Sequence, residues 1–415
     1  MDITDPRNPQ LLWERTYTDL EMTSSYPSVV RVKDKWFVVF GSGPSATAPN
    51  CDGTSTKNGH IFVVDLEDGN PYQSGGNDWL FETNETNAFM NSPVSLDKNM
   101  NNNVDAVYFG ETYFASSRWQ GKLYKIAIPW TDGGGNYDGS DCTNYSDDPL
   151  EWQLSSFFDA GSSPITAAPV LSVDSLGNAW VYVGSGRYFN TEDKLNTDQQ
   201  YLFGIKDPFF NGEHSPDGQF ADDYYHNYSA SLELGKTDLL DADDYVVSKG
   251  LGGKVYEGTT YIGYWNDLLD LARAKDGWIR SLTIPGERVL EKPAILGGTL
   301  FATSFVPNDD VCEYGGDSYL YALFYETGTA YSNPAFSDAD TEGEGFIIVD
   351  IGGETVEQVL DKTSLGSGKS ASVGIHVGEE KGAKGYTQLS TGEVFDALYN
   401  PAFNVKSGLR SWQEK

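Results

Sequence analysis

A strand pattern recurs four times along this chain of 415 residues, and it restricts the possible fold more than any other feature. Each copy begins with a proline beside small or apolar residues and continues into three apolar strand-like segments separated by Gly-rich turns. The pattern prolines are Pro27, Pro93, Pro169 and Pro293. One such meander cannot bury both faces of its strands, whereas several packed side by side can. We therefore predict an all-β fold of β-propeller type, with an ordinary β-sandwich as the alternative.

The expected strands follow directly from the four copies. Propeller blades contain about 40–50 residues, so the wider proline spacings imply long insertions and an irregular blade between residues 206 and 280. Helical periodicity is convincing only near residues 263–273. The segment around Asp174 predicts a hairpin turn followed by a buried Trp180. The predicted strands are 26–30, 36–43 and 59–69; 92–96, 104–110 and 121–126; 168–171, 179–186 and 200–205; 292–295, 299–303 and 318–323.

Charge and hydropathy exclude two classes of partner. The formal net charge is −33, and such a field repels nucleic acid and anionic membranes. No apolar run reaches the roughly 18 residues that a membrane-spanning helix needs. We therefore expect no nucleic-acid partner and no direct membrane insertion.

The few cysteines and histidines argue against a transition-metal site. The three cysteines and four histidines lack the spacings that zinc or iron sites use. Cys51 and Cys142 both stand in polar, Gly-rich segments, so in an oxidising compartment we expect a disulfide between them, with Cys312 left over. No nucleophile–base pair, paired catalytic carboxylates or phosphate loop stands out, so we predict neither catalytic residues nor an organic cofactor.

Oxygen-bearing side chains occupy alternate positions from Asp97 to Asp105, where a short loop could wrap one hard cation. Calcium takes six to eight oxygen ligands at about 2.3–2.6 Å. Asn102 stands where a turn needs positive φ, which asparagine tolerates. The loop is not an EF-hand, because Tyr108 replaces the closing glutamate, and the alternative is an Asn-rich polar turn. The predicted calcium ligands are Asp97, Asn99, Asn101, the carbonyl of Asn103, and Asp105.

Three stretches together resemble the C-terminal domain of the PilY family, proteins of type IV pilus biogenesis and of the pilus tip. They are the Asp97–Asp105 loop, the segment from Gly286 to Leu323, and the final Arg410-Ser411-Trp412-Gln413-Glu414. The middle stretch is the most specific, because no general physical rule requires its sequence. The resemblance covers nearly the whole chain, from about Leu12 onward.

The resemblance implies a modified seven-bladed, quinoprotein-like propeller that forms a single domain over residues 1–415, without the N-terminal region of the family. It implies a calcium-dependent role in pilus extension and surface adhesion, with type IV pilus (minor pilin) subunits as partners. It places the protein at the cell surface or pilus tip, exported through the periplasm and outer membrane. Asn99 and Asn101 stand where the family often has aspartates, so we expect weaker calcium affinity.

Two other functions suit the same architecture. One is a secreted enzyme, either a quinoprotein dehydrogenase or a glycosidase. The dehydrogenase is disfavoured because the chain has no adjacent cysteines, whereas a glycosidase could draw its two carboxylates from distant blades. The other is a glycan-binding lectin, which a Tyr-rich insertion within residues 211–244 would suit. The chain lacks Arg-Gly-Asp, and its sequence does not identify an adhesive target.

Overall fold

The computed structural model describes residues 4–45, 53–98, 100–131, 144–208, 233–308, 315–336, 345–377 and 383–403. The chain divides into two compact units. The first comprises Met1–Trp180 and Lys206–Gly235, and the second comprises Val181–Ile205 and Lys236–Lys415. The units are interleaved in sequence, because a short piece of the second interrupts the first.

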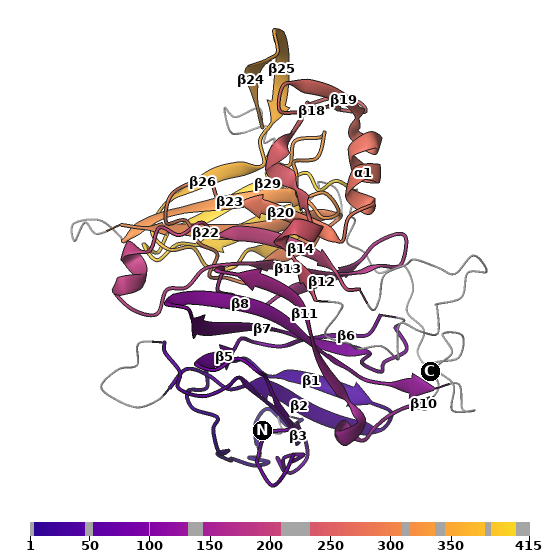
Figure 1. Cartoon of the computed structure of the whole chain (residues 1–415), viewed down its shortest axis with the longest axis vertical. Helices are drawn as coiled ribbons and strands as arrows, with labels where there is room; N and C mark the ends of the chain where they lie inside the picture. The colour runs from indigo at the N-terminus through magenta and orange to yellow at the C-terminus, as the bar shows by residue number, and fades with distance from the viewer. Residues whose placement is uncertain are drawn as a thin grey trace. The chain divides into compact units, whose positions relative to one another are not determined.

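Two antiparallel meanders build most of the first unit (Figure 1). Strands β1 to β4 form a sheet in chain order, and the longest pair of the second sheet, β7 and β8, is in continuous register from Ala106↔Ala127 to Ala115↔Arg118. The last strand of that sheet, β15, adds parallel to β11. The bounds are β1 Ser28–Val32, β2 Lys35–Gly41, β3 His60–Asp65, β4 Phe81–Glu82, β5 Ala88–Met90, β6 Val94–Leu96, β7 Ala106–Ala115, β8 Arg118–Ala127, β9 Trp130–Thr131, β10 Asn144–Tyr145, η1 Pro149–Glu151, β11 Gln153–Gly161, β12 Val170–Val173 and β15 Leu234–Gly235.

A buried ion pair lies in the core of the first unit. Lys125 on β8 and Asp207 are both inaccessible to solvent, and the Lys125 Nζ lies 2.9 Å from each carboxylate oxygen of Asp207. Tyr108, directly opposite Lys125 on β7, donates its hydroxyl to the same carboxylate at 2.6 Å. Burial lowers the pKa of Lys125 to about 8, despite the opposing charge of Asp207.

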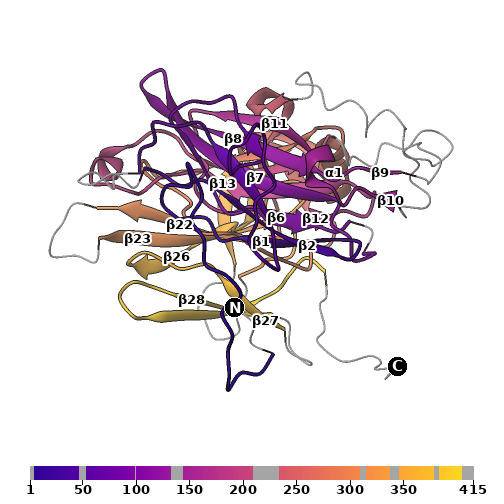
Figure 2. The ribbon, with the colours of Figure 1, turned by 90° about the horizontal axis from the view of Figure 1, so that it is seen from below.

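The second unit repeats the meander design. Strands β22, β23 and β26 lie side by side in both views of the ribbon (Figures 1 and 2), and they enclose a core around Phe301, Leu320 and Tyr399. The chain passes into this unit within β13. The bounds are β13 Ala179–Gly184, η2 Glu192–Leu195, β14 Tyr201–Lys206, η4 Lys236–Asp238, β16 Leu240–Asp241, η5 Ala242–Asp244, β20 Gly277–Ser281, β21 Ala294–Leu296, β22 Thr299–Pro307, β23 Gly316–Phe324, β26 Lys362–Ser367, β27 Gly374–Val377, β28 Ala383–Gln388 and β29 Val394–Tyr399.

A smaller cluster of strands in the second unit combines β17 to β19 and helix α1, from the region where an irregular blade is predicted, with β24 and β25 from much later in the chain. Tyr256, Ile351 and Val356 form its apolar core. Helix α1 buries Trp265 and Leu268 on one face, as its predicted periodicity requires. The bounds are β17 Tyr245–Val247, β18 Lys254–Glu257, β19 Thr260–Tyr264, α1 Trp265–Arg273, β24 Phe346–Ile351 and β25 Glu354–Val359.

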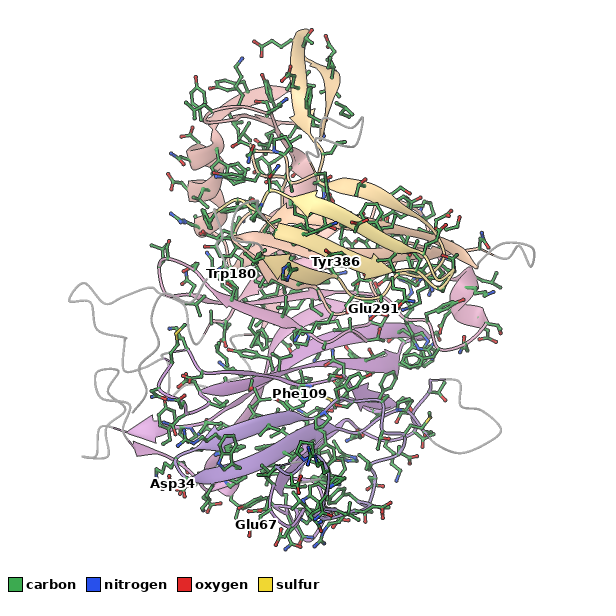
Figure 3. All side chains as sticks on the ribbon, turned by 180° about the vertical axis from the view of Figure 1, so that it is seen from behind. Asp34, Glu67, Phe109, Trp180, Glu291 and Tyr386 are labelled. Atoms are coloured by element: carbon green, nitrogen blue, oxygen red, sulfur yellow. The ribbon has the colours of Figure 1, made fainter. Side chains whose placement is uncertain are left out.

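The strand predictions are confirmed for all four copies, which become β1–β3, β6–β8, β12–β14 and β21–β23. The Asp174 turn is also confirmed: its carboxylate accepts hydrogen bonds from the backbone N–H of Asn178 and the indole N–H of the buried Trp180. Figure 3 shows Trp180 and Phe109 among the strands, whereas Asp34 and Glu67 lie on exposed turns. Among the described residues, none of the helices is long and apolar enough to cross a bilayer.

Some predictions concern residues outside the described ranges. Cys51, Cys142 and Cys312 are among them, so the disulfide stays a prediction. The single domain over residues 1–415 also stays a prediction.

Candidate functional site

The predicted calcium loop joins β6 to β7 in the first unit. The two strands pair from Val94↔Tyr108 to Leu96↔Ala106, so the loop starts and ends at adjacent points of one sheet. The backbone N–H of Asp105 donates to the carbonyl of Leu96, which closes the base of the loop. The sheet therefore brings the first and last predicted ligands close together.

Asp97 organises the loop backbone. Its carboxylate accepts hydrogen bonds from the backbone N–H groups of Asn101, at 3.1 Å, and Asn102, at 2.7 Å. The turn needs positive φ at Met100 and at Asn102, with values of 57° and 68°. The prediction for Asn102 is confirmed, and Met100 is a second such residue that the sequence did not reveal. The two bonds turn the loop inward around the Asp97 carboxylate.

Asp105 is the buried end of the loop and is only 3% exposed. One carboxylate oxygen accepts a 2.6 Å hydrogen bond from the hydroxyl of Tyr145, and the other accepts from the backbone N–H of Lys98 at 2.6 Å. Burial raises the pKa of Asp105 above its usual range, although both hydrogen bonds oppose that shift. The Asn101 amide contacts the same Tyr145 oxygen at 3.1 Å, so Tyr145 links two predicted ligands.

The Asn103 side chain has a role that the sequence did not predict. Its carbonyl oxygen accepts a 2.6 Å hydrogen bond from the backbone N–H of Lys33, in the turn between β1 and β2. The side-chain Oδ1 of Asn101 in turn accepts a hydrogen bond from the Asn103 backbone N–H at 2.8 Å. The bond to Lys33 fixes the loop against the neighbouring sheet, and the bond to Asn101 stiffens the loop itself.

The donor chemistry of the loop fits a hard cation. Each carboxylate oxygen of Asp97 and Asp105 accepts a single hydrogen bond and retains a lone pair that could bind a metal ion. The other predicted ligand atoms are amide oxygens, which hard cations also bind. Asn99 lies outside the described residues. Within the described ranges, no three His, Cys, Asp or Glu side chains gather as a metal site, which agrees with a loop holding only two carboxylates. Tyr145 was missed because it comes from 40 residues farther along the chain.

The most specific stretch of the resemblance, which begins at Gly286, holds a buried polar centre in the second unit. The Glu287 carboxylate accepts hydrogen bonds from the hydroxyls of Ser304, at 2.5 Å, and Tyr321, at 3.0 Å. Lys362 forms an ion pair with it at 2.8 Å. Burial raises the pKa of Tyr321, and the neighbouring Glu287 carboxylate adds to that shift. Glu287 therefore joins β22, β23 and β26 by contacts of its side chain.

Arg288, the next residue, holds the segment around η2. Its guanidinium donates to four backbone carbonyls, those of Gly286, Arg187, Asp193 and Asn196. It is 3% exposed, and burial lowers its pKa. The two adjacent charged residues therefore have structural partners, and sequence reasoning gave no signal that they are buried.

No family model matches the chain. PilY1 of Pseudomonas aeruginosa, a type IV pilus biogenesis factor, is 26% identical over 413 residues, covering 95% of this chain and 32% of that protein. A PilY1 homolog of Xylella fastidiosa is 24% identical over 343 residues, covering 79% of this chain and 22% of its own length. The chain thus spans a third or less of the length of these curated relatives.

The crystal structure of the Pseudomonas aeruginosa PilY1 C-terminal domain has the same fold. It superposes with a TM-score of 0.62 and 19% identity, covering 97% of this chain and 78% of that domain. The predicted fold class, an all-β modified propeller, is confirmed by this match. The resemblance of the chain to the C-terminal domain of the PilY family, which the sequence predicted, is therefore confirmed.

Proposed function

We propose that this chain acts in type IV pilus biogenesis, as a non-enzymatic, calcium-binding module of the pilus tip that supports pilus extension and surface adhesion. The observation that carries this proposal is the similarity to PilY1 over 95% of the chain. Its partners are minor pilin subunits, and its route leads through the periplasm and outer membrane to the cell surface. The names of the relatives support a role in pilus biogenesis rather than catalysis.

The calcium ion is held by Asp97, Asn99, Asn101, the carbonyl of Asn103, and Asp105. Bound there, it would neutralise the two carboxylates and stiffen the loop between β6 and β7. Loops with few charged ligands bind weakly, so we expect a Kd of roughly 10⁻⁵ to 10⁻³ M, with magnesium excluded by its demand for a tighter octahedron. The hydrogen bonds of Asp97 and Asn101 support this proposal, because they already turn both side chains toward the loop interior.

Calorimetric titration of the wild-type chain and of Asp97→Asn tests the calcium site. Asn keeps one hydrogen-bond acceptor for the loop backbone but removes a charged ligand, so affinity should fall at least tenfold with little loss of fold stability. Asp34→Asn, on the exposed turn between β1 and β2, is the matched control and should bind as the wild type does. Asp105→Ala is a poorer test, because it also removes the contacts with Tyr145 and Lys98. Equal affinity in wild type and Asp97→Asn would place the ion elsewhere.

The role in the pilus is tested in cells that carry the natural gene. A strain lacking the gene should lose surface pili, and the wild-type gene should restore them. If calcium supports extension, the Asp97→Asn gene should restore fewer pili in a strain that can still retract them, while Asp34→Asn restores them fully. Normal piliation without the gene would contradict the biogenesis role, whereas normal piliation with Asp97→Asn would contradict only the calcium part.

A further inference from the structure

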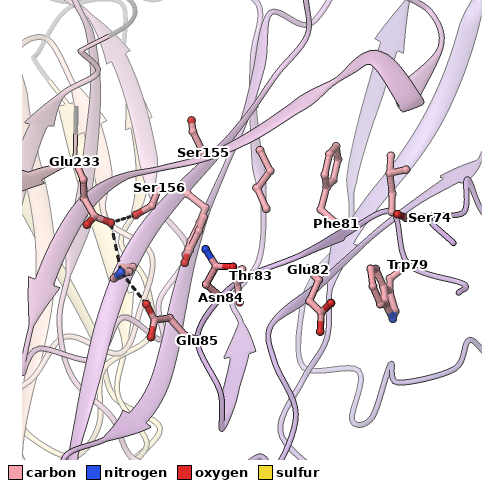
Figure 4. Close-up of a pocket in the computed structure, with 14 residues that line it drawn as sticks. Ser74, Trp79, Phe81, Glu82, Thr83, Asn84, Glu85, Ser155, Ser156 and Glu233 are labelled. Atoms are coloured by element: carbon pink, nitrogen blue, oxygen red, sulfur yellow. Dashed lines mark hydrogen bonds and ion pairs between the residues drawn. The ribbon is translucent and has the colours of Figure 1, made fainter. Parts of the chain in front are cut away.

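A polar pocket of about 670 Å³ lies in the first unit, and no residue of the calcium loop is among those that line it (Figure 4). One wall is β4 with its flanking residues, and the other comes from β8, from β11, and from Glu233 just before β15. Pockets that hold small ligands usually measure about 300–1,000 Å³. The lining residues are Ser74, Trp79, Leu80, Phe81, Glu82, Thr83, Asn84, Glu85, Lys122, Tyr124, Leu154, Ser155, Ser156 and Glu233.

The pocket carries an excess of negative charge. Three carboxylates line it, those of Glu82, Glu85 and Glu233, against the single ammonium of Lys122. Glu82 lies 3.4 Å from the Nε2 atom of His60, while Glu85 and Glu233 are at the opposite end of the pocket (Figure 4). This balance favours a cationic ligand and disfavours an anionic one.

One ammonium group, that of Lys122, already lies between two carboxylates of the pocket. Lys122 Nζ lies 2.7 Å from Glu85 and 3.5 Å from Glu233, and it bridges the two carboxylates. Burial by itself would lower the pKa of Lys122, but the hydrogen bond to Glu85 and the charge of Glu233 outweigh it and raise that pKa. Ser156 also donates its hydroxyl to Glu233, which fixes that carboxylate on the wall. The two glutamates are therefore arranged to hold an ammonium ion.

The rest of the pocket suits a ligand with many hydroxyl groups. Ser74 and Asn84 line it with further polar side chains that can donate and accept hydrogen bonds. Trp79, stacked on His60 with ring centroids 4.8 Å apart, and Phe81 supply apolar surface beside these polar groups.

We propose that this pocket binds an aminated saccharide, whose ammonium group contacts Glu85 and Glu233 while its hydroxyl groups pair with the polar residues toward Trp79. The ligand ammonium shares the two carboxylates with Lys122. This goes beyond the pilus role proposed above, since it names a ligand class and a site that the calcium loop does not contribute to.

A pair of trisaccharides with one skeleton isolates the amine. Calorimetry of the whole chain at about pH 6, below the usual pKa of such amines, should detect binding of the glucosamine trimer. The N-acetylglucosamine trimer, which has the same ring skeleton without the charge, should bind at least tenfold more weakly. Added salt should weaken only the binding of the charged trimer. Cadaverine, an amine without a sugar, should bind more weakly than the glucosamine trimer.

Substitutions on the two sides of the ion pair should act in opposite directions. Glu85→Gln and Glu233→Gln each remove a carboxylate and should weaken binding several-fold. Lys122→Gln removes the competing ammonium and should strengthen binding of the glucosamine trimer. If the ion pair were merely structural, this substitution would not strengthen binding. Glu67→Gln, an exposed carboxylate after β3, is the control and should leave binding unchanged. Thermal melting establishes that each variant is folded, and Lys122→Arg, which keeps the cation, should bind as wild type does.

Several outcomes would overturn the proposal. Equal binding of the two trimers would show that the ligand's amine is not recognised. Cadaverine binding as tightly as the glucosamine trimer would show that the sugar is not recognised. Loss of binding in folded Lys122→Gln would contradict competition between the two ammonium groups. The absence of binding by the folded wild type at millimolar trimer would reject the site, and it would leave the pilus role untouched.

Discussion

At the scale of single residues, Glu111 is a carboxyl group that folding makes hard to ionise. It is fully buried, and the Thr83 hydroxyl donates to one of its oxygens. Burial raises its pKa from 4.5 to about 8, and the charge of Glu85 adds to the shift. The folded chain therefore binds more protons than the unfolded chain between these two values. Stability from this group is fully present below pH 4.5 and is lost as pH rises toward 8.

We predict that Glu111→Gln flattens this pH dependence. The amide keeps the shape of the side chain but cannot ionise, so the loss of thermal stability between about pH 5 and 9 should shrink relative to wild type. Above pH 8 the variant should melt higher than wild type. Melting curves across pH, with Glu67→Gln as an exposed control, provide the measurement. If the melting temperature of Glu111→Gln depended on pH as that of the wild type does, another group would be responsible for the pH dependence.

Glu287 gives a second prediction at this scale. Glu287→Ala should cost about 3–5 kcal/mol, because it leaves the Lys362 ammonium and the Tyr321 hydroxyl without the carboxylate they share. Denaturant unfolding measures the loss. The double variant Glu287→Leu with Lys362→Met should be less destabilised than Glu287→Ala, since no charge stays uncompensated. A double variant as unstable as the sum of its two single changes would contradict this account.

How far single residues could be predicted depended on whether their partners are near in sequence. Asp97 and Asn102 were assigned from local spacing, and their backbone bonds and φ values lie within the same loop. Tyr145, which pairs with Asp105, could not be found, because only the fold brings it there. The burial of Lys125 was likewise hidden, since a lysine in an alternating strand normally faces solvent.

At the scale of elements, the Arg288 side chain stabilises the segment that contains η2 by hydrogen bonds to its backbone. That short helix has few backbone bonds of its own, and the guanidinium supplies donors to the carbonyls of Asp193 and Asn196. Arg288→Lys should therefore cost on the order of 2–4 kcal/mol, because a lysine lacks the planar fork that reaches several carbonyls at once. Faster hydrogen exchange confined to residues 187–196 is the expected signature. Uniform exchange across the unit would indicate global destabilisation.

Elements were predictable where local patterning determines them. The strands of the four repeats follow from alternating apolar residues and Gly turns, and helix α1 follows from its 3.6-residue period. The strands outside the four copies were not predicted. Among them, β15 and β16 leave the least local signal, because each has two residues and pairs in parallel with a strand distant in sequence. Such pairing depends on the assembled sheet and leaves no periodic trace in the sequence.

For the whole molecule, the net charge of −33 implies self-repulsion in the folded state. With 61 acidic against 28 basic residues, most carboxylates have no cation to pair with. Thermal stability should therefore rise by several degrees as sodium chloride increases toward about 0.5 M, where the Debye length falls well below its roughly 10 Å value at 0.1 M. Exposed ion pairs such as Lys254–Glu354 oppose the trend only weakly. A melting temperature that falls with salt would mean that paired charges outweigh repulsion.

The repeats predicted the class of fold, but they did not predict how the chain is divided between two units. That division depends on contacts such as Lys125 with Asp207, whose partners are 82 residues apart. Closing a loop of that length costs conformational entropy, and local sequence patterns do not show which distant residues will pair.

The position of Asp207 also has a consequence for the order in which the chain can fold. Lys125 and Tyr108 are made early, whereas their shared carboxylate is made only after strands that belong to the second unit. Burying Lys125 before Asp207 arrives would desolvate a charge without its counter-ion, at a cost of several kcal/mol. We therefore expect the packing of β7 and β8 around Lys125 to be completed only after Asp207 has been synthesised.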